Sequence, residues 1–308
     1  MIVCTLPLLV ILSQAPSPPG ALSTAREQIR QGNCAAAIDT LTLLLHSSAK
    51  SRPEVAVPYQ LLAVCYERSG QLDRAIDTLR DGLRDHPASP ALERTLGELL
   101  FHQDPSNPEA GQLLASAVKT APQDPEARHY YAQWAALNNR DEICASQEQA
   151  AIRLPGLNNL ALLQMYALQG ICLNHLDKPA AAKSALEKAF AIDLRQKPFD
   201  PAIAYQYVQF LMGRGQNEEA REVVAEILRR SPQFGPAHLE AAKSFDHDRQ
   251  TEKAIQEAKA ALLGEGDDDA NIRAAHVLLA KNYFILGKTA EAEAEQQWVE
   301  SHAGASKP

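Results

Sequence analysis

Few residues of this sequence have the types and spacing needed for chemistry. Two serines are followed three positions later by lysine, at Ser47–Lys50 and Ser116–Lys119, as in some enzymes with a serine nucleophile. Such a two-residue pattern arises by chance in most chains of this length, so we assign neither pair a function. The sequence has no HExxH zinc motif, no Walker phosphate loop, no GxSxG elbow and no GxGxxG dinucleotide motif. We therefore expect no catalytic residue and no enzymatic activity.

Clusters of acidic residues raise the separate question of a metal ion. Two such clusters are Asp246-His247-Asp248 and Asp267-Asp268-Asp269. A divalent-cation site needs several oxygen atoms that converge from a loop of fixed geometry, and neither cluster has the spacing of a helix–loop–helix calcium site. We interpret both as solvated turns and expect neither a metal ion nor a cofactor.

The composition indicates an all-α protein that does not bind nucleic acid. Aromatic residues make up 6% of the chain, while Ala, Leu, Glu and Gln, which lose little side-chain freedom in a helix, recur throughout. The 30 basic and 38 acidic residues give a net charge of −8, and no block of lysine and arginine occurs. Nucleic-acid-binding proteins usually carry a basic patch, so we do not expect DNA or RNA as a partner.

The first 25 residues differ from the rest of the chain. Ile2–Leu12 is apolar, a proline-rich segment of small residues follows it, and the first charged residue is Arg26. A run of this length is too short to span a bilayer but suits the core of a secretory signal peptide, with Ser23-Thr24-Ala25 as the cleavage site. Because no lysine or arginine precedes the run, an uncleaved N-terminal anchor is an open alternative. We predict a signal peptide over residues 1–25 and no integral membrane span.

Internal repetition organises the remainder of the chain. The clearest unit is Tyr59–Pro87, with the sequence YQLLAVCYERSGQLDRAIDTLRDGLRDHP. It resembles the tetratricopeptide repeat, a helix–turn–helix unit with characteristic residues at fixed spacing. The residues that carry the resemblance are Tyr59, Leu62, Ala63, Tyr66, Gly70, Ala75, Leu79, Gly82 and Pro87.

The residue types of this unit suit two helices packed side by side. Small residues at Ala63 and Ala75 let the helices approach closely. Gly70 lies just past the first helix, where a left-handed backbone conformation is needed. Pro87 prevents the second helix from continuing. At the start of the solenoid, we predict that Thr24–Glu27 forms a capping box that opens the first helix.

The pattern recurs at intervals of 34 to 38 residues. A small residue opens the second helix of each unit, at Ala37, Ala75, Ala110, Cys144, Ala182, Ala220, Ala254 and Ala292. The resemblance implies an all-α fold, a right-handed superhelical solenoid of about eight helix pairs in which neighbouring pairs cover each other's apolar faces. We assign residues 26–299 to this solenoid and residues 300–308 to a flexible C-terminal tail. The fourth unit is the weakest match, because Asn138-Asn139 replaces the usual glycine.

The register that the resemblance implies gives the cysteines and two histidines a structural interpretation. Cys34 and Cys65 fall at neighbouring places in successive units, and Cys144 and Cys172 nearly repeat that relation. We predict disulfides Cys34–Cys65 and Cys144–Cys172, against the alternative that each cysteine is a small buried residue. His238 and His276 occupy equivalent packing positions, so we expect them in the core rather than as metal ligands.

In this family the first helices line a concave groove. Carrying the register over gives the candidate peptide-binding residues Gln60, Val64, Arg94, Glu98, His129, Gln133, Tyr205, Gln209, Lys243 and Lys281. Amides can hydrogen-bond an extended peptide backbone, and tyrosine and arginine often anchor interfaces. The Lys and Asn clamp with which some family members hold a C-terminal carboxylate is missing, because Gln60, Val64, Arg94 and Glu98 occupy its positions.

These observations predict a non-enzymatic repeat scaffold that binds a protein or peptide partner in its groove. We expect export to the bacterial cell envelope, secreted or periplasmic, or a cytoplasmic location if the N-terminal segment is not a signal peptide. The alternatives are a homo-oligomerising structural scaffold and an accessory subunit of an envelope complex. Self-association would use the terminal repeat, where Val277, Leu278, Phe284 and Ile285 are apolar for an end cap.

Overall fold

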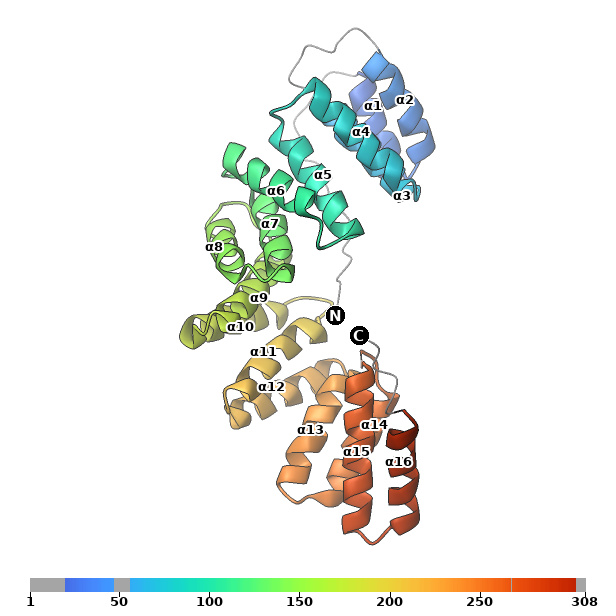
Figure 1. Cartoon of the computed structure of the whole chain (residues 1–308), viewed down its shortest axis with the longest axis vertical. Coiled ribbons are helices and arrows are strands. Elements are labelled where there is room, and N and C mark those ends of the chain that lie inside the picture. The colour runs from blue at the N-terminus through green and yellow to red at the C-terminus, as the bar shows by residue number, and fades with distance from the viewer. Residues whose placement is uncertain (1–19, 47–55, 267, 303–308) are drawn as a thin grey trace. The chain divides into compact units, whose positions relative to one another are not determined.

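In a computed structural model of the chain, the described residues are 20–46, 56–266 and 268–302 (Figure 1). The regular structure within these residues is helical, apart from one isolated bridge between Phe234 and Glu265. None of the described helices is both long enough and apolar enough to cross a membrane. The apolar run Ile2–Leu12, the pair Ser47 and Lys50, and Asp267 lie outside the described residues.

The chain divides into two compact units, residues 1–122 and residues 123–308. The first unit contains three successive helix pairs. Its helices are α1 (Ala21–Arg30), α2 (Cys34–His46), α3 (Ala56–Arg68), α4 (Leu72–Asp85), α5 (Pro90–Gln103) and α6 (Pro108–Thr120).

The second unit contains five successive helix pairs. Its helices are α7 (Pro125–Leu137), α8 (Asp141–Ile152), α9 (Asn159–His175), α10 (Pro179–Asp193), α11 (Pro201–Gly213), α12 (Asn217–Arg230), α13 (Gly235–His247), α14 (Thr251–Leu263), α15 (Asp269–Ile285) and α16 (Thr289–Ser301). The last helix continues through Ser301, two residues beyond the predicted end of the solenoid.

Within each unit, every helix packs against the next one along the chain. The two helices of a pair contact each other, and the second helix of a pair also contacts the first helix of the following pair, as α2 does with α3 and α8 with α9. Because the apolar face of one pair is covered by its neighbours, the core runs along each unit instead of forming one centre. The expected all-α solenoid of helix pairs is confirmed.

Small residues set the close approach within the pairs. The predicted opening positions are all buried, at Ala37, Ala75, Ala110, Cys144, Ala182, Ala220, Ala254 and Ala292. Glycine is needed at further contacts within the pairs, including those of Gly82, Gly97 and Gly170. A Cβ on Gly97 would lie 2.8 Å from Leu114 Cγ, and one on Gly170 would lie 2.6 Å from Leu186 Cγ, distances shorter than van der Waals contact.

Seven of the eight turns inside the described helix pairs use a left-handed residue, and the turn between α5 and α6 does not. Gly32, Gly70, Gly215 and Gly287 have φ between 70° and 77°. In the α7–α8 pair, whose turn has no glycine, Asn139 takes this conformation with φ of 56°, because asparagine tolerates it better than most residues. Asp177 and Arg249 also adopt it in their pairs, at φ of 50° and 57°.

The predicted start of the first helix was wrong. Instead of opening at Thr24, α1 begins at Ala21, and Gly20 is its N-cap. The Ser23 hydroxyl accepts a hydrogen bond from the Gly20 N–H at 3.1 Å, so the capping interaction lies one turn earlier than expected. The residues after Gly20 contain no helix breaker, so the helix can begin there instead of one turn later.

Candidate functional site

The ten candidate groove residues fall on the first helix of their pairs, and the two units hold them separately. In the first unit, Gln60 and Val64 lie on α3, and Arg94 and Glu98 lie on α5. Val64 and Glu98 are buried, while Gln60 and Arg94 are half-buried. The Gln60 amide donates hydrogen bonds to Ala91 O and to Thr95 Oγ1, both at 3.0 Å. Gln60 therefore links two successive first helices.

In the second unit, α7 holds His129 and Gln133. His129 Nδ1 lies 2.6 Å from Oε1 of Glu148 on α8, and Gln133 Nε2 lies 2.9 Å from His129 Nε2. Burial lowers the pKa of His129, but the charge and hydrogen bond of Glu148 raise it, and the net direction is upward. Burial also raises the pKa of Glu148, against the opposing effect of His129. His129 is therefore engaged inside its own helix pair.

The same histidine–glutamate contact recurs in two later pairs. His238 Nδ1 lies 2.7 Å from Glu257 Oε2, and His276 Nδ1 lies 2.5 Å from Glu295 Oε2. Each histidine is mostly covered, with 16% and 14% of the side chain exposed. In the part of the chain that the structure describes, no group of His, Cys, Asp and Glu side chains is arranged to hold a metal ion.

The first helices α11 and α13 are joined through a shared carboxylate. The Tyr205 hydroxyl on α11 donates to Glu240 Oε1 on α13 at 3.1 Å. Lys243 Nζ donates to the same Glu240 oxygen at 2.8 Å. Glu240 is 12% exposed and Lys243 is 40% exposed. The carboxylate thus holds the lysine ammonium in place while leaving part of it open to solvent.

A second shared carboxylate joins α13 to α15. Lys281 Nζ donates to Asp246 Oδ2 at 2.7 Å, and Asn282 Nδ2 donates to Asp246 Oδ1 at 2.9 Å. Lys281 remains 56% exposed. We call the surface formed by Tyr205, Gln209, Glu240, Lys243, Asp246 and Lys281 the α11–α15 face. Its two lysines offer hydrogen-bond donors that the carboxylates already hold in position, and Gln209 adds an exposed amide.

A surface hollow of about 280 Å³ lies elsewhere in the second unit, between α10, α11 and α12. Its walls include Glu187, Tyr207 and Glu219. The Tyr207 hydroxyl donates to Glu219 at 2.5 Å, and Lys183 Nζ donates to Glu219 at 2.6 Å. The hydrogen bonds of Lys183 and Tyr207 lower the pKa of Glu219. The polar groups of Lys183, Tyr207 and Glu219 are hydrogen-bonded to one another. We therefore do not assign this hollow a ligand.

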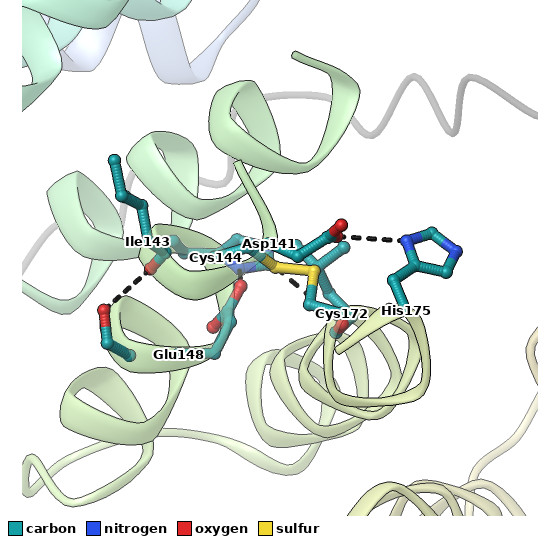
Figure 2. The surroundings of a disulfide bond; sticks show 9 residues. Asp141, Ile143, Cys144, Glu148, Cys172 and His175 are labelled. Carbon is teal, nitrogen blue, oxygen red and sulfur yellow. Dashed lines mark hydrogen bonds and ion pairs between the residues drawn. A yellow bond between two sulfur atoms is a disulfide. The ribbon is translucent and has the colours of Figure 1, made fainter. Parts of the chain in front are cut away.

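One predicted cysteine pair is bonded in the structure. A disulfide joins Cys144 on α8 to Cys172 on α9, with Cα atoms 6.2 Å apart (Figure 2). Beside it, His175 Nδ1 lies 3.0 Å from Asp141 Oδ1. Both contacts connect the second helix of one pair to the first helix of the next. They hold the α8–α9 crossing together.

The other predicted pair, Cys34 and Cys65, is present as two free thiols. Cys65 is fully buried and Cys34 is half-buried. Burial, followed by the hydrogen bond and charge interaction with Cys34, raises the pKa of the Cys65 thiol to about 12. The two side chains are therefore in contact, and their covalent pairing stays a prediction.

Sequence reasoning did not identify the carboxylates that position the lysines. Glu240 lies one helical turn before Lys243, a spacing that places both on one side of a helix. Asp246 precedes Lys281 by 35 residues, about one repeat. The separation of 19 residues between each histidine and its glutamate is a third periodic signal.

Comparison with protein families supports the repeat. Two models of the tetratricopeptide repeat match the chain, one over residues 56–99 and the other over residues 175–244. No curated protein sequence matches the chain.

Solved structures match over most of the chain. A tetratricopeptide repeat protein from Parabacteroides merdae has a TM-score of 0.57 at 11% identity, covering 84% of this chain and 97% of its own. The C-terminal part of a repeat-containing protein from Cytophaga hutchinsonii has a TM-score of 0.58 at 14% identity, covering 82% and 98%. PilF from Pseudomonas aeruginosa has a TM-score of 0.56 at 18% identity, covering 68% and 91%. At these identities the similarity is one of fold.

Proposed function

This chain is a tetratricopeptide repeat protein, and we propose that it acts as a non-enzymatic scaffold that binds a polypeptide partner along its first helices. Repeat solenoids present extended surfaces to which an unfolded segment or a protein edge can bind. Since fold alone does not specify function, the proposal rests on a particular surface.

The α11–α15 face is the observation that carries the proposal. Three successive first helices are joined there by the shared carboxylates Glu240 and Asp246, and each carboxylate fixes a lysine that remains partly exposed. Because these side chains are already ordered, less conformational entropy is lost when a partner binds. The alternation of ammonium, carboxylate and the Gln209 amide suits the carbonyl and N–H groups of an extended peptide.

Affinity capture from the native host, followed by mass spectrometry, tests this proposal. The variant Lys243→Glu with Lys281→Glu reverses the side-chain charge at both positions that the carboxylates hold. We expect this variant to lose the partner that the wild-type chain retains. The matched control, Lys178→Glu with Lys253→Glu, makes the same change in net charge on exposed lysines away from the face. Both variants are first checked for folding by circular dichroism.

The captured partner is then tested with the purified chain by calorimetry. A loss of affinity in the face variant together with unchanged affinity in the control supports binding on the α11–α15 face. Equal affinity in the wild-type chain and the face variant would contradict it. The candidates Arg94 and Glu98 of the first unit would be the next positions to substitute.

We further propose that the protein is exported to the bacterial cell envelope. The apolar run Ile2–Leu12 supports this, and so does the Cys144–Cys172 disulfide, because structural disulfides persist mainly in oxidising compartments. The predicted cleavage site Ser23-Thr24-Ala25 falls within α1, where Ala25 is fully buried. Cleavage there would shorten α1, so intact-mass measurement of the native protein distinguishes a cleaved signal peptide from a retained anchor.

A second candidate function is self-assembly, either as a structural scaffold or as an accessory subunit of an envelope complex. Val277, Phe284 and Ile285 on α15 are 50%, 74% and 56% exposed, which favours a protein contact at the last helix pair. Light scattering of the purified chain tests this candidate, and a monomer at all concentrations would contradict it.

A further inference from the structure

A buried carboxyl group ends α10 in the second unit. Asp193 is the last residue of this helix and is completely buried. Its Oδ1 accepts a hydrogen bond from the Asp200 N–H at 3.0 Å, whereas Oδ2 is buried and has no hydrogen-bond partner among the residues that the structure describes. An ionised carboxylate can accept about four hydrogen bonds. The ionised form of Asp193 is therefore poorly solvated at this position.

The end of a helix is also an unfavourable place for a negative charge. The last carbonyl groups of α10 form the negative end of the helix dipole, and the carboxyl group of Asp193 lies at that end. Asp85 also ends a second helix, α4, but it is exposed, so water can solvate its charge. Burial therefore distinguishes Asp193 from Asp85.

The surroundings of Asp193 favour its neutral form. Burial is the largest influence and raises the pKa of Asp193 to about 6, although the hydrogen bond from the Asp200 N–H lowers it. The negative charge of Asp200, the N-cap of α11, raises the pKa further, and the positive charge of Arg230, at the end of α12, lowers it. The neighbouring helix α9 contains no Asp, Glu, Lys or Arg, and its titratable side chains include Tyr166 and His175. Arg230 is thus the cation that acts on this carboxyl group.

Asp193 holds two parts of the loop that leads from α10 to α11, residues 194–200. Its backbone carbonyl accepts a hydrogen bond from the Gln196 N–H at 2.9 Å, and its side chain accepts one from the Asp200 N–H. Asp200 in turn caps α11, because its side chain accepts hydrogen bonds from backbone N–H groups of the first turn. The loop side chains of Arg195 and Lys197 are exposed. Opening of this surface loop would let water reach the buried carboxyl group.

We propose that Asp193 is a pH-sensitive switch that keeps the α10–α11 loop closed in mildly acidic solution and lets it open when the carboxyl group ionises. The neutral carboxyl group accepts the Asp200 N–H without the cost of a buried charge. Loss of its proton to water leaves a buried carboxylate with one hydrogen bond, and opening of the loop solvates this charge. The loop leads into α11, which carries Tyr205 and Gln209 of the α11–α15 face. The inference does not depend on peptide binding there.

Ionisation of Asp193 favours the open loop. The pKa of Asp193 is about 6 with the loop closed, whereas a solvated aspartate ionises near pH 3.9. Because the closed state has the higher pKa, its stabilisation is complete below about pH 3.9 and is lost as pH rises through about 6. The equilibrium constant for opening should therefore increase about tenfold between pH 5 and pH 7.5.

An NMR titration of the full chain with ¹³C-labelled aspartate measures the ionisation directly. The carboxyl signal that is missing in Asp193→Asn belongs to Asp193, and its midpoint is expected at about pH 6. Asp200→Asn keeps an N-cap residue but removes a negative charge, so it should lower the midpoint. Arg230→Gln removes a positive charge and should raise it. A wild-type midpoint near pH 4, the value of a solvated aspartate, would overturn the proposal.

Hydrogen exchange followed by mass spectrometry measures opening of the loop. After correction for intrinsic exchange rates, the protection of residues 194–200 should fall about tenfold between pH 5 and pH 7.5 in the wild-type chain and stay constant in Asp193→Asn. Asp85→Asn is the matched control, because it removes an exposed aspartate from a helix end and should retain the tenfold fall.

Asp200→Asn provides a second test that leaves the buried side chain intact. Its protection of residues 194–200 should fall at a lower pH than in the wild-type chain, because the pKa of Asp193 is lowered when the neighbouring charge is removed. An equal fall in the wild-type chain and in Asp193→Asn would show that other groups control the loop and would overturn the switch. Constant protection in the wild-type chain would overturn it as well.

Discussion

Two helix crossings carry cysteine pairs at similar places in the repeat, and they differ in how they are held. At the α8–α9 crossing, Cys144 and Cys172 form a disulfide, and His175 and Asp141 form an ion pair beside it. At the α2–α3 crossing, Cys34 and Cys65 remain thiols in contact with each other. Both crossings link the second helix of one pair to the first helix of the next.

The difference shows that one packing position can serve two purposes. A small buried residue is needed where successive pairs approach, and cysteine satisfies that need whether or not it is oxidised. A disulfide adds a constraint on the unfolded chain that packing alone does not supply. The α2–α3 crossing is thus a packed contact, and the α8–α9 crossing is a packed contact with a covalent bond.

The largest expected effect comes from removing the bonded pair. Cys144→Ala with Cys172→Ala opens a loop defined by a sequence separation of 28 residues, which the chain-entropy model values at about 3–4 kcal/mol. We expect urea denaturation to show a loss of that order in the free energy of unfolding. Cys34→Ala with Cys65→Ala serves as the control and should cost less, because no covalent bond is lost; equal losses would show that packing dominates at both crossings.

Oxidation of the second pair should make the two crossings alike. With glutathione disulfide as oxidant, Cys34 and Cys65 lose two protons and two electrons, and the oxidant is reduced to two glutathione thiols. We expect a gain of about 2 kcal/mol in the free energy of unfolding, less than the full entropic value because some strain accompanies closure. Intact-mass analysis should show a loss of two hydrogens. Separate glutathione adducts on each thiol would contradict the pairing.

While reduced, the α2–α3 crossing should weaken at alkaline pH. The folded-state pKa of Cys65 is raised to about 12 by burial and by Cys34, whereas an unfolded thiol ionises near pH 8.5. Since the folded pKa is the higher one, the stabilisation is complete below the unfolded pKa and declines as pH rises toward 12. We expect a loss of about 1 kcal/mol by pH 9.5, measured by denaturation across pH. Cys65→Ala should abolish this component, and an unchanged slope in that variant would assign it elsewhere.

The smallest effect is expected at the ion pair beside the disulfide. His175 is 55% exposed, and exposed pairs contribute about 0.5 kcal/mol or less. His175→Ala should therefore leave the unfolding midpoint nearly unchanged in the disulfide-bonded chain. A loss comparable to that of the cysteine variant would mean that the α8–α9 crossing depends on electrostatics and not on the disulfide.

The sequence was sufficient for the fold because the determining signals are local and periodic. Small residues at the opening of each second helix and glycine in four of the turns predict the helix pairs, and Asn139 fills the glycine position of the fourth pair as the register requires. The start of α1 was misplaced because only the cap at Thr24 was considered, whereas the helix begins one turn earlier. The structure uses Gly20 with Ser23.

The candidate site was less predictable, because its properties depend on contacts between repeats. Lys243 and Lys281 were identified by register, but Glu240 and Asp246, which position them, were not. His129 was expected in the groove and instead contacts Glu148 on the adjacent helix. The register of the repeat specifies the helix on which a residue lies. The hydrogen-bond partner of its side chain depends on rotamers and on neighbouring residues, which periodicity does not encode.

The 38-residue correspondence between α13–α14 and α15–α16 has a consequence for how the molecule can change in length. Both pairs close with the same histidine–glutamate contact and the same left-handed turn. A tandem duplication of residues 235–272 would therefore give the added copy its own type of neighbour on each side. Each added copy would then lengthen the row of first helices by one helix without changing the contacts inside the existing pairs.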